Sequence, residues 1–223
     1  MHDFLATVER WTRRMGFAAM SGTLAVLLWG IWHGTQRPLG HKTGREPQMM
    51  RTPAFYALAS VGYFGLCYRL WRPLRLTLSL PARVLALLLG SFLYFTGMTL
   101  VLAGRLALGR MYNVSSSFGA QLYADQQLVT HGPFAYVRHP MYLGILLVGL
   151  GGLFLYRTWT FVFIMAHWPG LIVRARREEQ ALAAEFGEQW ANYCRDVPAW
   201  LPRYEWFPFT SGMYKANSVF GQP

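Results

Sequence analysis

Charged residues are scarce in this sequence, and acidic ones are the scarcest. Asp, Glu, Lys and Arg make up 14% of the 223 residues, while 53% are hydrophobic. An ordinary soluble domain has about 25% charged residues, so there is too little charge here to cover a soluble globule of this length. The composition also excludes an intrinsically disordered chain and a collagen-like one. We therefore expect a membrane protein.

Cysteine is almost absent as well. Cys67 lies within an apolar run and Cys194 lies far along the chain, without a C-x-x-C pair and without His residues at zinc-ligand spacing. The sequence therefore predicts neither a disulfide framework nor a metal site.

The charge that is present is unbalanced, with 21 Lys and Arg against 10 Asp and Glu and a net charge of +11. A strongly basic chain is often a nucleic-acid binder. Here the basic residues are scattered between apolar spans, and 9 Trp, 12 Tyr and 15 Phe accompany them. This combination favours membrane lipids with anionic headgroups as partners, rather than nucleic acid.

Three apolar runs have the length of membrane helices. Residues 16–32 carry no charge and would span about 25 Å as a helix. Arg10, Arg13 and Arg14 precede this run as in a signal peptide, but no cleavage site follows, so we interpret it as a retained helix. Residues 53–70 and 84–104 are the second and third candidates.

The fourth hydrophobic region consists of two short arms, residues 142–156 and 158–173, separated only by Arg157. Each arm would measure about 22 Å as a helix, less than the roughly 30 Å of a hydrocarbon core. We therefore expect a helical hairpin that is partly sheltered by protein. Its glycines would let a neighbouring backbone approach closely; they are Gly144, Gly149, Gly151 and Gly152.

The loops predict only part of the membrane topology. The hairpin tip has one basic residue, whereas the chain after Val173 has six, which places the tip outside and the C-terminus in the cytoplasm. Five crossings would then place the N-terminus outside. The arginines near residue 10 argue against that location, because basic residues favour the cytoplasmic side. The aromatic tail, residues 204–223, either lies in the membrane interface, which we favour, or folds over the site.

Residues 105–140 form the longest stretch of mixed polarity, with Gln126 and Gln127 among its polar residues, and lead into the segment from His131 to Tyr142. Gly132-Pro133 predicts a turn, and Pro140 predicts the first turn of a helix. Arg138 and His139 would then lie at a helix N-terminus, whose outward N–H groups suit a polar or carboxylate ligand. In the alternative interpretation, Arg138 anchors a lipid phosphate and His139 merely caps the helix.

A second candidate region is an amphipathic helix after the hairpin. Leu182, Phe186, Trp190 and Tyr193 form one helical face, and Val197-Pro198 ends the helix. Two carboxylates belong to this region: Glu179 falls within the apolar stripe and Glu178 lies at its edge. Such groups need partners, because burying an unpaired charge is costly. Those partners are either a ligand or simply the neighbouring arginines, Arg174, Arg176 and Arg177.

These two regions carry a family resemblance. The first block, from His131, reads H-G-P-F-x-x-V-R-H-P-x-Y-x-G, and the second, from Glu178, reads E-E-x-x-L-x-x-x-F-G-x-x-W-x-x-Y-x-x-x-V-P. In this order, around a hydrophobic hairpin, they resemble the isoprenylcysteine carboxyl methyltransferase and phospholipid methyltransferase superfamily. Its members are integral membrane enzymes that transfer a methyl group from S-adenosylmethionine to a lipophilic acceptor.

The resemblance implies the site residues. Arg174 matches a position that meets the substrate carboxylate in the prenylcysteine enzymes, and His139 or Glu179 would assist if a proton must leave an amine or thiol acceptor. Phe134 departs from the Tyr of many members, so that a hydroxyl contact to the cofactor is lost or replaced. The residues implied to contact S-adenosylmethionine are Leu128, Val129, Phe134, His139, Pro140, Met141, Tyr142 and Glu178.

The sequence therefore predicts an all-α polytopic membrane protein with about five transmembrane helices and a cytoplasmic amphipathic C-terminal helix. We expect acceptor-side helices in residues 1–110, a methyltransferase core in residues 111–203 and an interfacial tail in residues 204–223. The acceptor is a carboxylate, a lipid amine or a small thiol or amine. Two alternatives are a sterol-type reductase using NADPH, whose C-terminal pattern is similar to Phe186–Cys194, and a non-enzymatic membrane scaffold.

Overall fold

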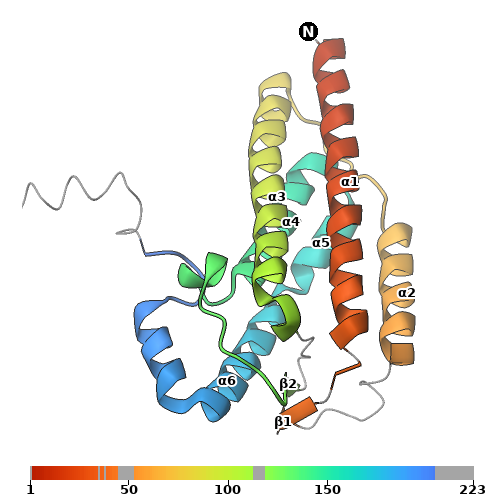
Figure 1. Ribbon diagram of the computed structural model, residues 1–223. Helices are drawn as coiled ribbons and strands as arrows, with labels where there is room; N and C mark the ends of the chain where they lie inside the picture. Colours follow the sequence, from red (N-terminus) through yellow and green to blue (C-terminus); the bar gives the residue numbers. More distant parts are fainter. Residues whose placement is uncertain (1, 35, 38, 45–52, 113–118, 204–223) are drawn as a thin grey trace, which may run out of the picture.

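The computed structural model describes residues 2–34, 36–37, 39–44, 53–112 and 119–203, and helices make up most of them (Figure 1). The helices are α1 (His2–Gly34), α2 (Pro53–Arg69), α3 (Leu80–Leu108), α4 (Pro140–Tyr156), α5 (Trp159–Ala166) and α6 (Trp168–Asp196), with short 3₁₀ turns η2 (Gly109–Met111) and η3 (Gly132–Ala135). The predicted interfacial tail, residues 204–223, lies outside the described residues, and the proposed domain boundaries stay predictions.

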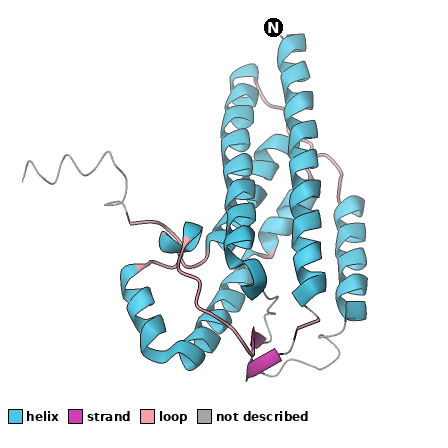
Figure 2. Ribbon diagram, in the orientation of Figure 1, coloured by secondary structure: helices cyan, strands magenta, loops and turns pink. Residues whose placement is uncertain are grey.

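Two short strands, β1 (Leu39–Gly44) and β2 (Gly119–Tyr123), form an antiparallel pair that the all-α prediction did not include (Figure 2). The pair lies at the end of the bundle from which α6 extends. Leu122 of β2 is buried against Ala181 of α6, with Leu182 and Phe186 packed around them. The strands thus place the segment that follows β2 alongside α6.

Among the described residues, two helices are long and apolar enough to cross a membrane: Asp3–Gly34 and Leu80–Met111. Large apolar side chains on several helices face outward, with Phe17 64%, Leu58 74% and Phe92 68% exposed. Such exposure indicates association with a membrane. The prediction of about five crossings is not confirmed, because α2 and α4 have 17 residues each and α5 has 8.

Helices α3 and α4 pack closely because glycines face each other across their contact. A Cβ atom at Gly97 would lie 2.6 Å from the Gly144 carbonyl oxygen, and one at Gly144 would lie 2.7 Å from the Gly97 carbonyl oxygen. Close backbone approach at small residues is typical of membrane helix pairs. The predicted role of Gly144 and Gly151 is confirmed, whereas Gly149 and Gly152 make room for the Met165 and Phe161 side chains of α5.

Replacing Gly97 with Leu is expected to destabilise the protein, because any side chain there collides with the α4 backbone. Overpacking of a close contact costs about 1–3 kcal/mol or more, and thermal unfolding in detergent measures the loss. A Cβ atom at Gly62 of α2 would have no neighbouring atom within 4 Å, so Gly62→Leu is the matched control. Equal melting temperatures for the two variants would contradict the described α3–α4 contact.

The hairpin is confirmed, but its second arm is not one helix. Arg157 forms the turn with a φ of 54°, and α4 and α5 run back along each other from it. The predicted arm 158–173 is divided at His167, where α5 ends and α6 begins. Pro169 explains the division, since its nitrogen cannot donate the hydrogen bond that a continuous helix would need there.

Helix α6 carries the predicted amphipathic segment as its second half. It bends at Gly187, which has a φ of 48°, a conformation that glycine adopts at little cost. Beyond the bend, Trp190, Tyr193 and Val197 form a buried cluster against Leu182 and Phe186. The predicted apolar face is therefore continuous across the bend.

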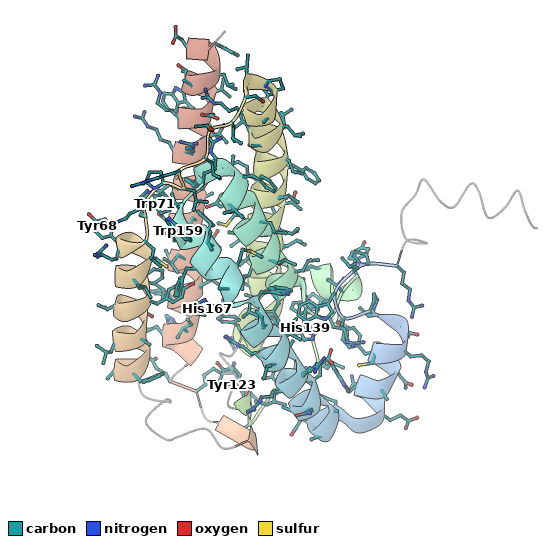
Figure 3. The ribbon with its side chains drawn as sticks, turned by 180° about the vertical axis from the view of Figure 1, so that it is seen from behind. Tyr68, Trp71, Tyr123, His139, Trp159 and His167 are labelled. Carbon is teal, nitrogen blue, oxygen red and sulfur yellow. The ribbon has the colours of Figure 1, made fainter. Side chains whose placement is uncertain are left out.

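The hairpin tip contacts the N-terminal part of α1 at the Glu9 carboxylate and at Arg13, which bonds to Leu155 and Tyr156 of the last turn of α4. Glu9 accepts hydrogen bonds from Arg83 at 2.9 Å and from Arg157 at 3.1 Å, and Arg13 lies 4.0 Å away. Trp71 and Trp159 lie near this tip (Figure 3). In the folded protein, arginines from other segments therefore add positive charge to this tip. The predicted membrane orientation counted only the one basic residue within the tip, and that orientation stays a prediction.

Candidate active site

The residues predicted to hold a cofactor surround one cavity, although they come from three separate segments. It lies where the end of α3, the turn before α4 and the first half of α6 meet, and one of its lining residues, His139, is labelled in Figure 3. Its lining includes every predicted cofactor residue and also Arg174; these are Leu128, Val129, Phe134, His139, Pro140, Met141, Tyr142, Arg174 and Glu178. Their role in binding a cofactor stays a prediction.

Glu178 presents its carboxylate to the cavity. The Tyr142 hydroxyl donates a hydrogen bond of 2.5 Å to Glu178 Oε1, and Arg174 Nε lies 3.5 Å from the same oxygen. The Arg174 guanidinium also lies over the Tyr142 ring, 5.6 Å from its centre. These contacts connect α4 to α6 and fix the direction of the carboxylate.

Glu179 lies outside the cavity lining and pairs with the turn before α4. Its Oε1 accepts a hydrogen bond from Arg138 Nε at 3.0 Å and lies 2.9 Å from His139 Nε2. Glu179, predicted to assist if a proton must leave the acceptor, thus faces the turn rather than the cavity, and its catalytic role stays a prediction. The partners that neutralise Glu179 come from the turn, 41 and 40 residues away in sequence, and not from the neighbouring arginines of its own helix.

The turn before α4 is bonded to the chain that follows α6. The Arg138 and His139 N–H groups donate to the Pro198 and Ala199 carbonyl oxygens at 2.9 and 3.0 Å. These two N–H groups are therefore satisfied within the chain, and ligand binding by the other N–H groups at the start of α4 stays a prediction. The Arg138 side chain adds bonds to the Cys194 and Val197 carbonyl oxygens, at 3.2 and 2.9 Å, so Arg138 holds the end of α6 and does not serve as a lipid anchor.

Aromatic side chains complete the wall around His139. The Trp200 and Tyr142 rings lie 5.1 and 5.6 Å from the His139 ring. The Tyr193 hydroxyl donates a 2.7 Å hydrogen bond to the Phe134 carbonyl oxygen. Burial raises the pKa of Tyr193 to about 12, so that this hydroxyl keeps its proton and remains a donor at neutral pH.

We expect Glu179 to determine part of the loss of folding stability at acidic pH. Burial alone would raise the pKa of this carboxyl, but its hydrogen bonds with His139 and Arg138 hold the pKa below the ordinary value, which is about 4.3. A carboxyl whose pKa is lowered by folding stabilises the fold above its unfolded pKa, and the contribution is lost as the pH falls through the folded pKa.

We therefore expect the melting temperature to fall as the pH drops below about 4, and Glu179→Gln to flatten this part of the profile. Unfolding scans in detergent between pH 7 and pH 3 measure both. Glu188 is exposed on the same helix, and Glu188→Gln should leave the profile unchanged. An identical acidic limb in the wild type and in Glu179→Gln would contradict the assignment.

The segment that builds this cavity matches a known family. Residues 85–189 match the model of the phospholipid methyltransferase family. The predicted resemblance to the isoprenylcysteine carboxyl methyltransferase and phospholipid methyltransferase superfamily is therefore confirmed over this segment. The family segment runs from the first turns of α3 through the hairpin to the bend in α6, and it therefore contains the predicted site residues.

Two relatives of this superfamily segment are called protein-S-isoprenylcysteine O-methyltransferase. The one from Schizosaccharomyces pombe is 36% identical over 80 residues, which cover 35% of this chain and 34% of the relative. The one from Mus musculus is 29% identical over 119 residues, 50% of this chain and 42% of the relative. The chain thus spans about a third to two fifths of the length of these relatives.

Some residues around the cavity were not predicted from the sequence. Leu27 of α1, Tyr112 after α3 and the pair Gln126 and Gln127 line it, and Trp200 packs against the lining residue His139. Polar composition singled out the two glutamines, but neither block of the motif includes any of these positions. These residues reach the cavity because α1 and the chain after β2 pack against residues 85–189 in the folded protein, and a local sequence motif does not reveal such packing.

Proposed function

We propose that the protein transfers a methyl group from S-adenosylmethionine to a lipophilic acceptor at the membrane. The observation that carries this proposal is the convergence on one cavity of all eight residues for which the family resemblance implies a cofactor contact. The superfamily match of residues 85–189 and the two O-methyltransferase relatives support methyl transfer. They do not favour the reductase alternative.

The chemistry of the lining fits this cofactor. Glu178 supplies carboxylate oxygens that accept hydrogen bonds from hydroxyl or amino groups, and Tyr142 and Arg174 hold it in place. Leu128, Val129 and Phe134 provide apolar surface suited to a flat adenine ring. A site with few directed polar groups on an apolar wall is typical of a cofactor pocket.

When bound, S-adenosylmethionine supplies a methyl group on a positively charged sulfur, and an in-line displacement transfers it. For such a reaction the protein mainly has to position the reactants and exclude water. The Tyr142 and His139 rings line the cavity, and the Trp200 ring packs against both of them. Arg174 is placed to orient a carboxylate acceptor, which needs no general base. For an amine or thiol acceptor, His139 with Glu179 is the group that we propose receives the proton.

The cavity also has an apolar side, where the acceptor would enter. Leu27, Val101 and Ile145 line it from α1, α3 and α4, the first two of which have the length and composition of membrane spans. A lipophilic chain can therefore lie against these helices while its polar end reaches the turn before α4. We propose a multi-pass arrangement with the cofactor site and the C-terminus in the cytoplasm, where a water-soluble cofactor has access.

The proposed function is tested by product analysis. The purified protein, in nanodiscs of phosphatidylethanolamine and phosphatidylglycerol, is incubated with methyl-labelled S-adenosylmethionine, with and without N-acetyl-S-farnesylcysteine. Mass spectrometry should detect label in a carboxyl ester or in a lipid amine. Thermal stabilisation by S-adenosylhomocysteine should accompany it. Stabilisation by NADPH in place of S-adenosylhomocysteine, with no labelled product, would overturn the proposal.

A further inference from the structure

A second cavity lies beside the candidate active site, between the C-terminal ends of α1 and α3. Trp29, Gly30 and His33 line it from α1, and Arg105 and Arg110 line it from the end of α3 and η2. Tyr112 lines both this cavity and the first one. The two cavities are therefore neighbours, separated in part by a single aromatic side chain.

The principal polar group of this second cavity is the Arg105 guanidinium. It lies over the Tyr112 ring, 4.6 Å from the ring centre, and Nη1 donates to the Gly109 carbonyl oxygen at 3.0 Å. Its Nε is buried and has no hydrogen-bond partner within the described part of the chain. The described carboxylates also form no ion pair with Arg105. An N–H buried in this way costs free energy unless something accepts its hydrogen bond.

Helix α1 leaves space for this guanidinium at Gly30. A Cβ atom at Gly30 would lie 2.8 Å from Arg105 Cζ, so any other residue would displace the charged group. The close approach of α1 therefore holds the guanidinium in the cavity and prevents it from turning out to solvent there.

The charge around the second cavity is positive. Among its lining residues are three arginines and no Asp or Glu. Arg37 is neutralised by Asp125, with Nη2 2.7 Å from Oδ1, and its guanidinium lies over the Tyr123 ring at 4.4 Å. Arg105 and Arg110 have no such ion pair among the described residues. An anion is the ligand that satisfies this arrangement.

We propose that this second cavity binds an anionic group of the methyl acceptor, a phosphate or a carboxylate, with Arg105 as its main donor. This inference rests on the proposed function, and it adds that the acceptor carries an anionic group close to the atom that is methylated. Arg174 lies in the first cavity, where it pairs with Glu178, so its proposed contact with the reacting group leaves the second cavity to Arg105. The acceptor then bridges the two cavities past Tyr112.

The test compares charged ligands with uncharged counterparts on the full chain in detergent. Dihexanoyl phosphatidic acid is paired with dihexanoylglycerol, and N-acetyl-S-farnesylcysteine with its methyl ester. We expect wild-type protein to bind one of the two anionic probes at least roughly tenfold more tightly than its neutral partner, as for a charge-assisted hydrogen bond in a buried site. The pair that shows the difference identifies phosphate or carboxylate.

Three variants decide whether Arg105 is responsible. Arg105→Gln should abolish the preference for the charged probe, and Arg105→Lys should retain part of it. Gly30→Ala should weaken it by displacing the guanidinium. Arg75→Gln removes the same charge from an exposed position in the connection before α3, at the other end of that helix, and should behave as wild type. An unchanged preference in Arg105→Gln, or none in wild type, overturns the inference.

Binding of S-adenosylhomocysteine, measured on the same samples, separates this inference from the proposed function. If the Arg105→Gln variant binds S-adenosylhomocysteine normally, the variant is folded. A loss of its preference for the anionic probe then supports the inference. If wild type binds the cofactor product but ignores the charge of the probes, only the second-cavity inference fails. If it prefers charged probes through Arg105 but binds no S-adenosylhomocysteine, the assignment to a methyl acceptor fails.

Discussion

Glu178→Gln is expected to weaken the binding of S-adenosylhomocysteine roughly a hundredfold, since hydrogen bonds to a charged group contribute about 1.5–3 kcal/mol each. Glu178 is the one carboxylate among the described residues that line the first cavity. Hydroxyl or amino donors of the cofactor therefore have a single strong acceptor there. Methyl transfer at subsaturating cofactor should fall by a similar factor.

The substitution is chosen so that loss of binding is not loss of folding. Gln keeps the size of Glu178 and an oxygen that accepts the Tyr142 hydrogen bond of 2.5 Å. Calorimetric titration with S-adenosylhomocysteine measures the affinity, and the melting temperature without ligand verifies the fold. Glu185→Gln removes the same charge from an exposed position of α6 and should bind normally. Unchanged affinity in Glu178→Gln would exclude Glu178 from the cofactor site.

The site could be predicted where local sequence fixes local geometry. Pro140 begins α4 at its first turn, as expected, and the turn at Gly132, with a φ of 63°, is the one that Gly132-Pro133 predicted. The helical spacing of Leu182, Phe186, Trp190 and Tyr193 likewise predicted an apolar face, which the structure buries at Trp190 and Tyr193 and partly buries at Leu182 and Phe186. In these cases a few neighbouring residues determine the conformation, so the sequence is sufficient.

The errors concern contacts that depend on distant chain crossings. Helical spacing correctly placed Glu179 near an apolar face, but its partners come from the turn before α4. The sequence predicted one arm over residues 158–173, whereas the structure divides it at His167. The apolar run continues through His167 and Pro169, so hydrophobicity alone does not reveal the division. The β1–β2 pair joins residues about 80 positions apart in sequence, and neither segment shows a strong alternation of its own.

Arg138→Gln is expected to lower the melting temperature by roughly 5–10 °C. Arg138 joins three parts of the site: Glu179 of α6, the Cys194 carbonyl oxygen near its end and the Val197 carbonyl oxygen beyond it. Loss of one partner of a buried pair costs about 3–5 kcal/mol, and we take about 2–3 kcal/mol because 27% of the Glu179 side chain is exposed. For a chain of this length, 1 kcal/mol corresponds to about 2–4 °C.

A double-mutant cycle separates the ion pair from the carbonyl contacts. Glu179→Gln removes the charge of the partner, and Arg138→Gln with Glu179→Gln removes both, so the loss in the double variant should be smaller than the sum of the single losses. The difference between that sum and the loss in the double variant measures the interaction energy of the Arg138–Glu179 pair. The rest of the Arg138→Gln effect comes from the hydrogen bonds of Arg138 to the Cys194 and Val197 carbonyl oxygens. Arg176→Gln, at an exposed position of α6, is the control. Strictly additive losses would show that Arg138 and Glu179 do not act as a pair.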